Sequence, residues 1–311
     1  MEKTVSNFIT KKNFSRRAFV GTSVAAGTAV MMGCDSVYPD LGITNPSGYS
    51  DKDLLNLALN IEYLEAEFYL RAATGSGLAA ADAGTGAGLV NGGRQVVFAS
   101  PADASYAYEL AQEELNHVRA LRSLLGSDAV PRPAIDFTAG FAILGTTAGV
   151  AASPFDPFSD SNYFLVGAFT FEDVGVTAYR GALALLSDAK NIATSASALA
   201  IEAYHASEVR TRILQNSYSS GVTTYLTAAN KISAFRASVG AGNETQIGPG
   251  SDGSATVSPN GLSAVDTTNS LGFSRSTDQI LRLLYGGTTA RISSGWFFPQ
   301  GLNGNIKAAS A

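Results

Sequence analysis

The chain of 311 residues has few of the side chains that usually reveal a protein's chemistry: one cysteine, two histidines and only 15% charged residues. A single cysteine excludes a disulfide framework and any metal site built from four cysteines of this chain. The formal net charge of −5, without a basic stripe, argues against nucleic acid as a partner. The 45% apolar content is enough for a substantial core. We therefore expect one large folded domain, or one domain with an appendage.

The N-terminus is typical of an export signal rather than of folded structure. A basic region that includes Arg16 and Arg17 precedes an uncharged run at residues 18–33, which is too short for a comfortable membrane span. The "SRRAFV" core resembles a twin-arginine export signal. We expect the twin-arginine export machinery as a partner and an extracytoplasmic location, in the periplasm or cell envelope.

The lone Cys34 directly follows "VMMG" at the end of this apolar run, an arrangement that resembles a bacterial lipobox. Two interpretations stay open: Cys34 is lipidated and anchors the protein, or it lies in a leader that is cleaved elsewhere. Residues 1–34 are thus assigned to the signal, and the Pro/Gly-rich residues 35–50 to a linker.

Apolar residues recur at helical spacing in four segments with few breakers, and the first two begin with capping residues, Ser50 or Asp51 and Ser100 before Pro101. The fold class expected is all-α, with a four-helix bundle over residues 51–217. A connection broken by prolines separates the second helix from the third. The four helical segments are residues 49–73, 100–126, 160–188 and 192–218.

Two further stretches are harder to assign. Residues 137–153 carry no charge, and they are either a marginal membrane span or, as we expect, a crossover lying on the bundle. Residues 218–311 are expected to form a loop-rich C-terminal extension with short helices near 226–240 and 276–286. Its "SGWFFPQGLNG" segment is expected to be an aromatic plug that packs against the bundle.

Both histidines close a Glu-x-x-His unit: Glu114 with His117, and Glu202 with His205. Residues three apart on a helix project from one face, so each pair can bind the same metal ion. The two pairs fall in the second and fourth predicted helices. This spacing predicts a metal site with ligands from both helices.

The first and third helices each offer a glutamate in an apolar setting, Glu62 and Glu172. An ionised carboxylate in a bundle core is costly unless it is paired or bound to metal. Tyr69 and Tyr179 each follow their glutamate by seven residues. They are either hydrogen-bond partners of ligand carboxylates or tyrosines that pack the core. The repeated order indicates two helical hairpins related by a pseudo-twofold axis.

Together these residues resemble the ligand set of the ferritin-like superfamily, which includes rubrerythrins, bacterioferritins and manganese catalases. "LNIEYLEAEFYLRAA" and the export signal look most like its desiccation-related branch. The resemblance covers about residues 50–217 and implies a ferritin-like four-helix bundle with a long crossover between helices two and three. It implies two Fe or Mn ions, with Zn as an alternative. The implied ligands are Glu62, Glu114, His117, Glu172, Glu202 and His205.

The ligand on the first helix has an alternative, since Glu65 lies on the same face as Glu62. Glu67 and Glu113 are expected to face solvent or neighbouring helices. The resemblance implies redox chemistry on dioxygen, peroxide or Fe(II), but the catalytic residues and the oligomeric state are unknown from sequence. The alternative is a non-catalytic extracytoplasmic protein, protective under stress, whose metal site is structural or vestigial.

Overall fold

The computed structural model describes residues 48–150, 154–248, 261–266 and 268–310. The expected twin-arginine signal and Cys34 lie outside the described residues.

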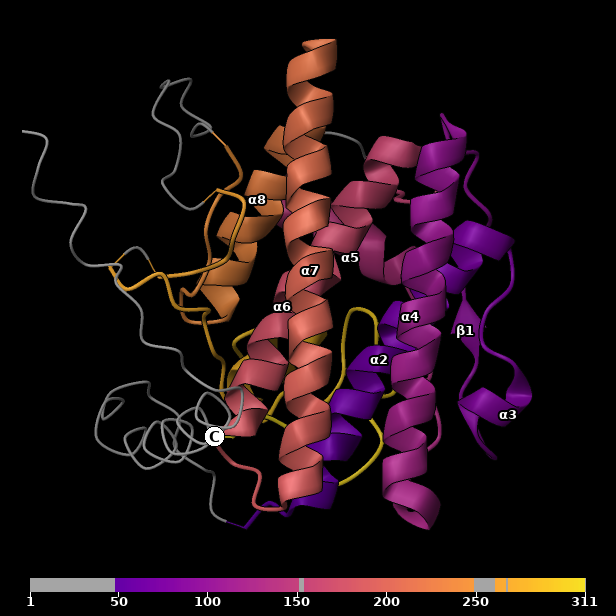
Figure 1. Ribbon diagram of the computed structural model, residues 1–311, viewed down its shortest axis with the longest axis vertical. Coiled ribbons are helices and arrows are strands. Elements are labelled where there is room, and N and C mark those ends of the chain that lie inside the picture. The colour runs from indigo at the N-terminus through magenta and orange to yellow at the C-terminus, as the bar shows by residue number, and fades with distance from the viewer. Residues whose placement is uncertain (1–47, 151–153, 249–260, 267, 311) are drawn as a thin grey trace, which may run out of the picture. The chain divides into compact units, whose positions relative to one another are not determined.

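Four long helices form the centre of the fold (Figure 1): α2 (Asp51–Thr74), α4 (Pro101–Leu125), α6 (Ser161–Leu183) and α7 (Ala189–Ser220). Helix α2 packs along α4, α6 packs along α7, and α2 also contacts α6. The predicted all-α bundle is confirmed, and its two hairpins are the ones that the repeated glutamate–tyrosine spacing indicated. The four helices therefore surround a common interior, where side chains from all of them can approach one another.

Each long helix begins at a side chain that caps its free backbone N–H groups. Ser50 forms a capping box at the start of α2. Ser100 caps α4, and Pro101 occupies the first turn, where a missing N–H does no harm. Asp160 and Asp188 accept backbone N–H hydrogen bonds at the starts of α6 and α7. The caps at Ser50 and Ser100 were read from the sequence, whereas Asp188 was not, and α7 begins at Ala189 instead of the predicted residue 192.

Asp51 joins the beginnings of α2 and α7. Its carboxylate accepts hydrogen bonds from the Ser187 amide at 3.0 Å, from the Asp188 amide at 2.9 Å and from the Asn191 side chain at 2.9 Å. Partial burial alone would raise the pKa of Asp51, but these hydrogen bonds together hold it below its usual 3.8.

We expect Asp51→Asn to destabilise the chain by about 1 kcal/mol at neutral pH, a value discounted for solvent screening. Because the folded pKa is depressed, the stabilisation is present above pH 3.8 and is lost as the pH falls through the folded pKa. Urea midpoints of both proteins at pH 7 and pH 3 test this. The difference between the two urea midpoints should be smaller at pH 3 than at pH 7. A larger difference at pH 3 would contradict the stabilising role of the Asp51 carboxylate.

The connection between α4 and α6 contains structure of its own. A short 3₁₀ turn, η1 (Gly126–Asp128), precedes strand β2 (Ile135–Asp136), which pairs in parallel with β1 (Val90–Asn91). Helix α5 (Phe137–Ala148) follows, and a four-residue helix α3 (Ala80–Ala83) lies in the α2–α4 loop. Among the described helices, none combines the length and apolar character that a membrane span needs. The uncharged segment thus supplies a helix of the crossover, which the sequence did not predict as a helix.

The described part of the C-terminal region packs on the bundle through α8 (Thr224–Val239) and α9 (Thr277–Tyr285), both of which contact α6. Phe297 of the aromatic segment lies 4.8 Å from the ring of Phe141 on α5 and 5.1 Å from that of Phe171 on α6. The predicted aromatic plug is therefore confirmed.

Buried ion pairs add a second link between the C-terminal region and the bundle. Asp173 on α6 pairs with Arg210 on α7 at 2.8 Å and with Arg236 on α8 at 2.6 Å. Glu244 pairs with Arg236 at 2.8 Å and with Arg275 at 2.7 Å. All five side chains are almost completely buried, so the network fixes α7 and α8 against the α6 residue that follows Glu172.

Candidate metal centre

The six glutamates and histidines singled out in the sequence lie together in the bundle interior. Each of the four long helices contributes: α2 and α6 one glutamate each, α4 and α7 a Glu-x-x-His unit each. The four glutamates are fully buried, His205 is 4% exposed and the side chain of His117 is 13% exposed. The hairpin packing of the helices therefore brings the predicted ligands to one place.

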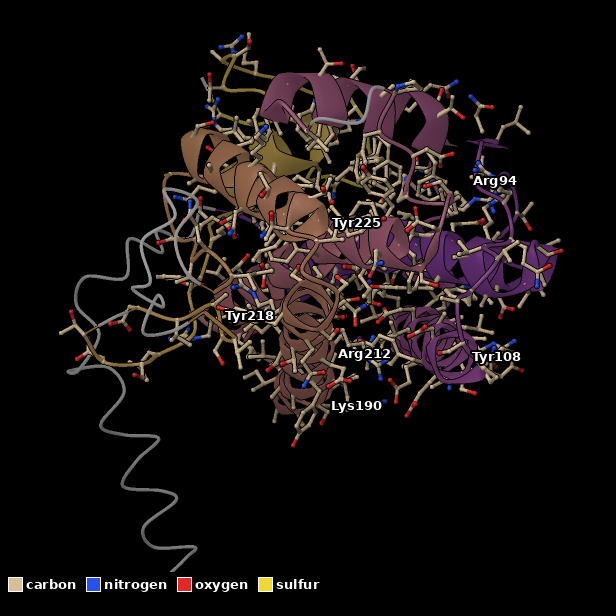
Figure 2. The ribbon with its side chains drawn as sticks, turned by 90° about the horizontal axis from the view of Figure 1, so that it is seen from above. Arg94, Tyr108, Lys190, Arg212, Tyr218 and Tyr225 are labelled. Atoms are coloured by element: carbon tan, nitrogen blue, oxygen red, sulfur yellow. The ribbon has the colours of Figure 1, made fainter. Side chains whose placement is uncertain are left out.

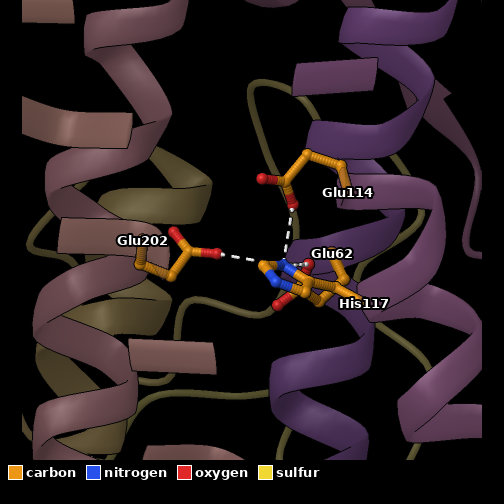
Figure 3. Close-up of side chains that lie close together, drawn as sticks. All are labelled: Glu62, Glu114, His117 and Glu202. Carbon is orange, nitrogen blue, oxygen red and sulfur yellow. Dashed lines mark hydrogen bonds and ion pairs between the residues drawn. The ribbon is translucent and has the colours of Figure 1, made fainter. Parts of the chain in front are cut away.

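The first group surrounds His117 (Figure 3). Its Nδ1 atom lies 3.2 Å from a carboxylate oxygen of Glu62, 3.3 Å from one of Glu114 and 3.5 Å from one of Glu202. One ligand atom from each of these four residues lies within 4.8 Å of the others. Such a cluster of three carboxylates and an imidazole can hold a metal ion.

The second group surrounds His205. Its Nδ1 atom lies 2.8 Å from Glu114 Oε1 and 3.4 Å from Glu172 Oε2. Glu114 thus belongs to both groups: its Oε1 faces His205 and its Oε2 faces His117. The two imidazole rings are 6.3 Å apart. A carboxylate placed between two such groups can bridge two metal ions.

Buried oxygen and nitrogen atoms that lack a hydrogen-bond partner show whether a metal ion would fit the cluster. Within the described chain, carboxylate oxygens of all four glutamates and Nδ1 of His205 are buried without a hydrogen-bond partner. Buried polar atoms are normally paired, and an unpaired carboxylate in a core is costly. A cation bound among these atoms would satisfy them, and the mixture of oxygen and imidazole donors suits Fe, Mn or Zn.

The pKa shifts of the carboxyl groups show that the negative charge in the cluster is only partly balanced. Burial raises the pKa of Glu62 to about 7, although the nearby His117 lowers it. Burial and the neighbouring Glu114 and Glu62 raise the pKa of Glu202 well above its usual range. The two imidazoles counter burial in Glu114 and hold the pKa of that carboxyl below its ordinary value. The cluster therefore favours any group that brings positive charge.

Two tyrosines orient the glutamates of α2 and α6 reciprocally. The Tyr69 hydroxyl, on α2, donates to Glu172 on α6, and the Tyr179 hydroxyl, on α6, donates to Glu62 on α2. Both tyrosines are buried, so each hydroxyl has the carboxylate as its partner instead of water. These contacts fix one oxygen of each glutamate and leave the other facing the cluster.

The structure places Glu62, and not Glu65, in the His117 group. Glu65 is 1% exposed, and neither of its carboxylate oxygens has a hydrogen-bond partner among the described residues. Burial, followed by the charge of Glu202, raises the pKa of Glu65 well above its usual range. Glu65 is thus a further buried carboxyl beside the cluster.

Two other glutamates, Glu67 and Glu113, form specific ion pairs whose partners the sequence did not indicate. Glu67 is fully buried and paired with Arg71 and Arg132, so it faces the crossover instead of solvent. Glu113 accepts a hydrogen bond from His205 Nε2 at 2.7 Å. Only its position next to Glu114 in sequence could have drawn attention to it.

A groove between α4 and α7 leads to His205. It is lined by aromatic, aliphatic and charged side chains, and its volume of about 360 Å³ is within the range of small-molecule sites. Arg212 extends from α7 toward α4 (Figure 2), where its guanidinium lies 4.0 Å from the centre of the Tyr106 ring. The lining includes Tyr106, Glu109, Leu110, Glu113, Tyr204 and His205. The second group is therefore next to a path from the surface.

Gly175 on α6 leaves space for this cluster. A Cβ atom there would stand 2.2 Å from Glu202 Oε2 and 3.2 Å from Glu65 Oε1. We expect Gly175→Ala to lower metal affinity about tenfold or more, because Glu202 must move, as changes to residues around ligands commonly do.

The stability of the metal-free Gly175→Ala protein should change by no more than about 1 kcal/mol, since alanine favours the helix interior. Calorimetric Mn(II) titration and urea unfolding measure the two effects separately. Gly272→Ala, where a Cβ meets nothing within 4 Å, is the matched control. Unchanged Mn(II) affinity in Gly175→Ala would refute the role of this space.

Comparison with known proteins places this geometry in context. Residues 50–215 match the family model described as Ferritin-like domain. The chain is 30% identical over 269 residues to the desiccation-related protein PCC13-62 of Craterostigma plantagineum, which covers 82% of this chain and 83% of the relative. It is 28% identical over 275 residues to the ferritin-like catalase Nec2 of Nesocodon mauritianus, which covers 85% and 86% respectively.

Proposed function

The chain belongs to the ferritin-like domain family, and on that premise we propose that it is an exported metalloprotein whose di-iron or di-manganese centre disproportionates peroxide. The observation that carries this proposal is the position of Glu114 between two carboxylate–histidine groups. The His117 group would hold one ion and the His205 group the other, with about two ions per chain.

Electron balance favours peroxide as the substrate. One peroxide loses two electrons and two protons to become dioxygen, and a second gains them to become two waters. When bound, a redox-active metal pair supplies the exchange of these two electrons. The reaction needs no external electron donor, and the single cysteine of this chain cannot form a four-cysteine electron-transfer site.

The chain's own residues would hold and shield the centre. Tyr69 and Tyr179 restrain the two glutamates of α2 and α6, which keeps one oxygen of each directed inward. The groove beside His205 is wide enough to admit a molecule of the size of peroxide. Complete burial of the four glutamates excludes bulk water from the rest of the cluster.

The names of the two relatives support different functions. One is called a ferritin-like catalase, which agrees with peroxide chemistry. The other is called a desiccation-related protein, which fits the alternative of a non-catalytic, stress-protective protein with a structural metal site. The groove that reaches His205 favours the first function, since a purely structural site needs no access path.

Oxygen release from hydrogen peroxide tests the proposal. The metal-free protein is loaded with Mn(II) or, without oxygen, with Fe(II), and dioxygen is followed with an electrode. We expect about one dioxygen per two peroxides with the loaded protein and none with the metal-free protein. Metal uptake without oxygen release would contradict the proposal. Oxygen consumption on Fe(II) addition would then indicate Fe(II) oxidation, and no turnover would indicate the structural role.

We also propose export by the twin-arginine machinery, with location in the periplasm or cell envelope and Cys34 as a lipid anchor. Arg16 and Arg17 ahead of an uncharged run support the first part, and the position of Cys34 at the end of that run supports the second. Replacing both arginines with lysine should leave the protein in the cytoplasm, and Cys34→Ser should release it from membranes. Fractionation of cells that express each variant checks both.

A further inference from the structure

The ligands and tyrosines of the two halves of the candidate metal centre correspond in pairs, but two carboxylates close to the cluster have no counterpart in the other half. The residue before the ligand Glu114 is Glu113, whereas the residue before Glu202 is Ile201. The residue three after Glu62 is Glu65, whereas the residue three after Glu172 is a glycine. Both extra carboxylates therefore belong to the first hairpin, and the pseudo-twofold relation is broken at these two positions.

The two histidines also differ in how many of their ring nitrogens have a partner. His205 uses both ring nitrogens: Nδ1 faces Glu114 and Glu172, and Nε2–H donates to Glu113 Oε2 at 2.7 Å. His117 uses Nδ1 alone, and in the described part of the chain its Nε2 has no hydrogen-bond partner. The corresponding residue on α7, Ile201, has no side-chain atom that could accept such a bond.

We propose that Glu113 is a positioning residue for His205, and that it makes the two metal positions unequal. This inference rests on the proposed metal pair. An acceptor on Nε2–H holds the proton on that nitrogen, which leaves the Nδ1 lone pair directed at Glu114 and Glu172. A carboxylate acceptor also makes the imidazole a stronger donor, and loss of such a partner typically lowers metal affinity about 10–100-fold. Only the His205 position has this support.

Calorimetric titration of the metal-free protein with Mn(II) tests whether Glu113 supports only one of the two metal positions. We expect Glu113→Leu to weaken one of the two binding steps about 10–100-fold and to leave the other unchanged. Glu109→Leu is the matched control, because Glu109 lies one turn earlier on α4 and lines the same groove without bonding a histidine. Two steps weakened equally, or neither, would overturn the inference.

A spectroscopic readout separates positioning from a general structural effect. The chain has only two histidines, so ¹⁵N-histidine labelling of the Zn(II)-loaded protein gives a spectrum that can be assigned. A downfield Nε2–H resonance of His205 should be present in the wild type and in Glu113→Gln, whose amide oxygen still accepts. It should be absent in Glu113→Leu, and its persistence there would refute the proposal.

Different results would overturn the metal centre and the role of Glu113. A wild-type protein that takes up neither Mn(II) nor Zn(II) would overturn the metal centre and this inference together. Normal uptake with an affinity that does not depend on residue 113 would overturn the inference alone. Should Glu113→Leu fold poorly, Glu113→Gln keeps the test decisive, since it retains the hydrogen bond but loses the charge and should weaken the same step to a smaller extent.

Discussion

Replacing Arg210 with methionine is expected to destabilise the folded chain by about 3–5 kcal/mol, because it leaves the buried Asp173 with only part of its positive partner charge. Arg210 donates to Asp173 through Nε at 3.0 Å and through Nη2 at 2.8 Å, and it also donates to the Thr245 carbonyl at 3.0 Å. Burial raises the pKa of Asp173, but Arg210 and Arg236 outweigh it and hold that pKa below its usual value. Methionine fills similar space without replacing any of these bonds.

Urea unfolding followed by circular dichroism measures the loss. Arg212→Met is the control, since Arg212 lies two residues away on α7 but is 27% exposed and pairs with the exposed Glu208. We expect the control to lose no more than about 1 kcal/mol. Equal losses in the two variants would show that the buried network is not what fixes the C-terminal region to the bundle.

The largest expected effect on metal binding is that of Glu114→Gln. Glutamine keeps the shape of the side chain but removes the negative charge from the one residue shared by both groups. Affinity should fall at both positions, by about 100-fold or more, since loss of even an outer partner costs about 10–100-fold. The variant should therefore hold less metal than the wild type at concentrations that saturate the wild type.

Glu109→Gln, also on α4 but outside both groups, is the matched control and should bind metal as the wild type does. Elemental analysis after dialysis against a defined Mn(II) concentration gives the metal content of each protein. Full occupancy in Glu114→Gln would show that this carboxylate does not join the two positions.

What the sequence revealed was local. Capping residues such as Ser50 and Ser100 mark helix starts regardless of the rest of the fold, and the helical spacing of apolar residues made the other two long helices predictable. The Glu-x-x-His spacing places Glu114 and His117 on one face of a helix, and this too needs no tertiary information. The structure accordingly brings together the residues that the sequence singled out.

What the sequence did not reveal depends on contacts between distant segments. Glu113 bonds His205, which is 92 residues away, and this pairing depends on the rotation of α4 against α7. Glu67 is buried because Arg132 in the crossover reaches it. Neither a helical period nor a motif specifies such pairings. The expectation that Glu67 faces solvent or a neighbouring helix was wrong, whereas Glu113 does face the neighbouring α7, though the sequence did not name its partner.

The metal content of the purified wild-type chain decides whether the four long helices hold a metal centre. Protein isolated without chelators, and then the same protein after reloading with Mn(II) or Fe(II), is analysed by elemental mass spectrometry against protein concentration. We expect about two Fe or Mn ions per chain. No bound metal under either condition would contradict this expectation, and the buried glutamates and histidines would then have to be explained without a metal centre.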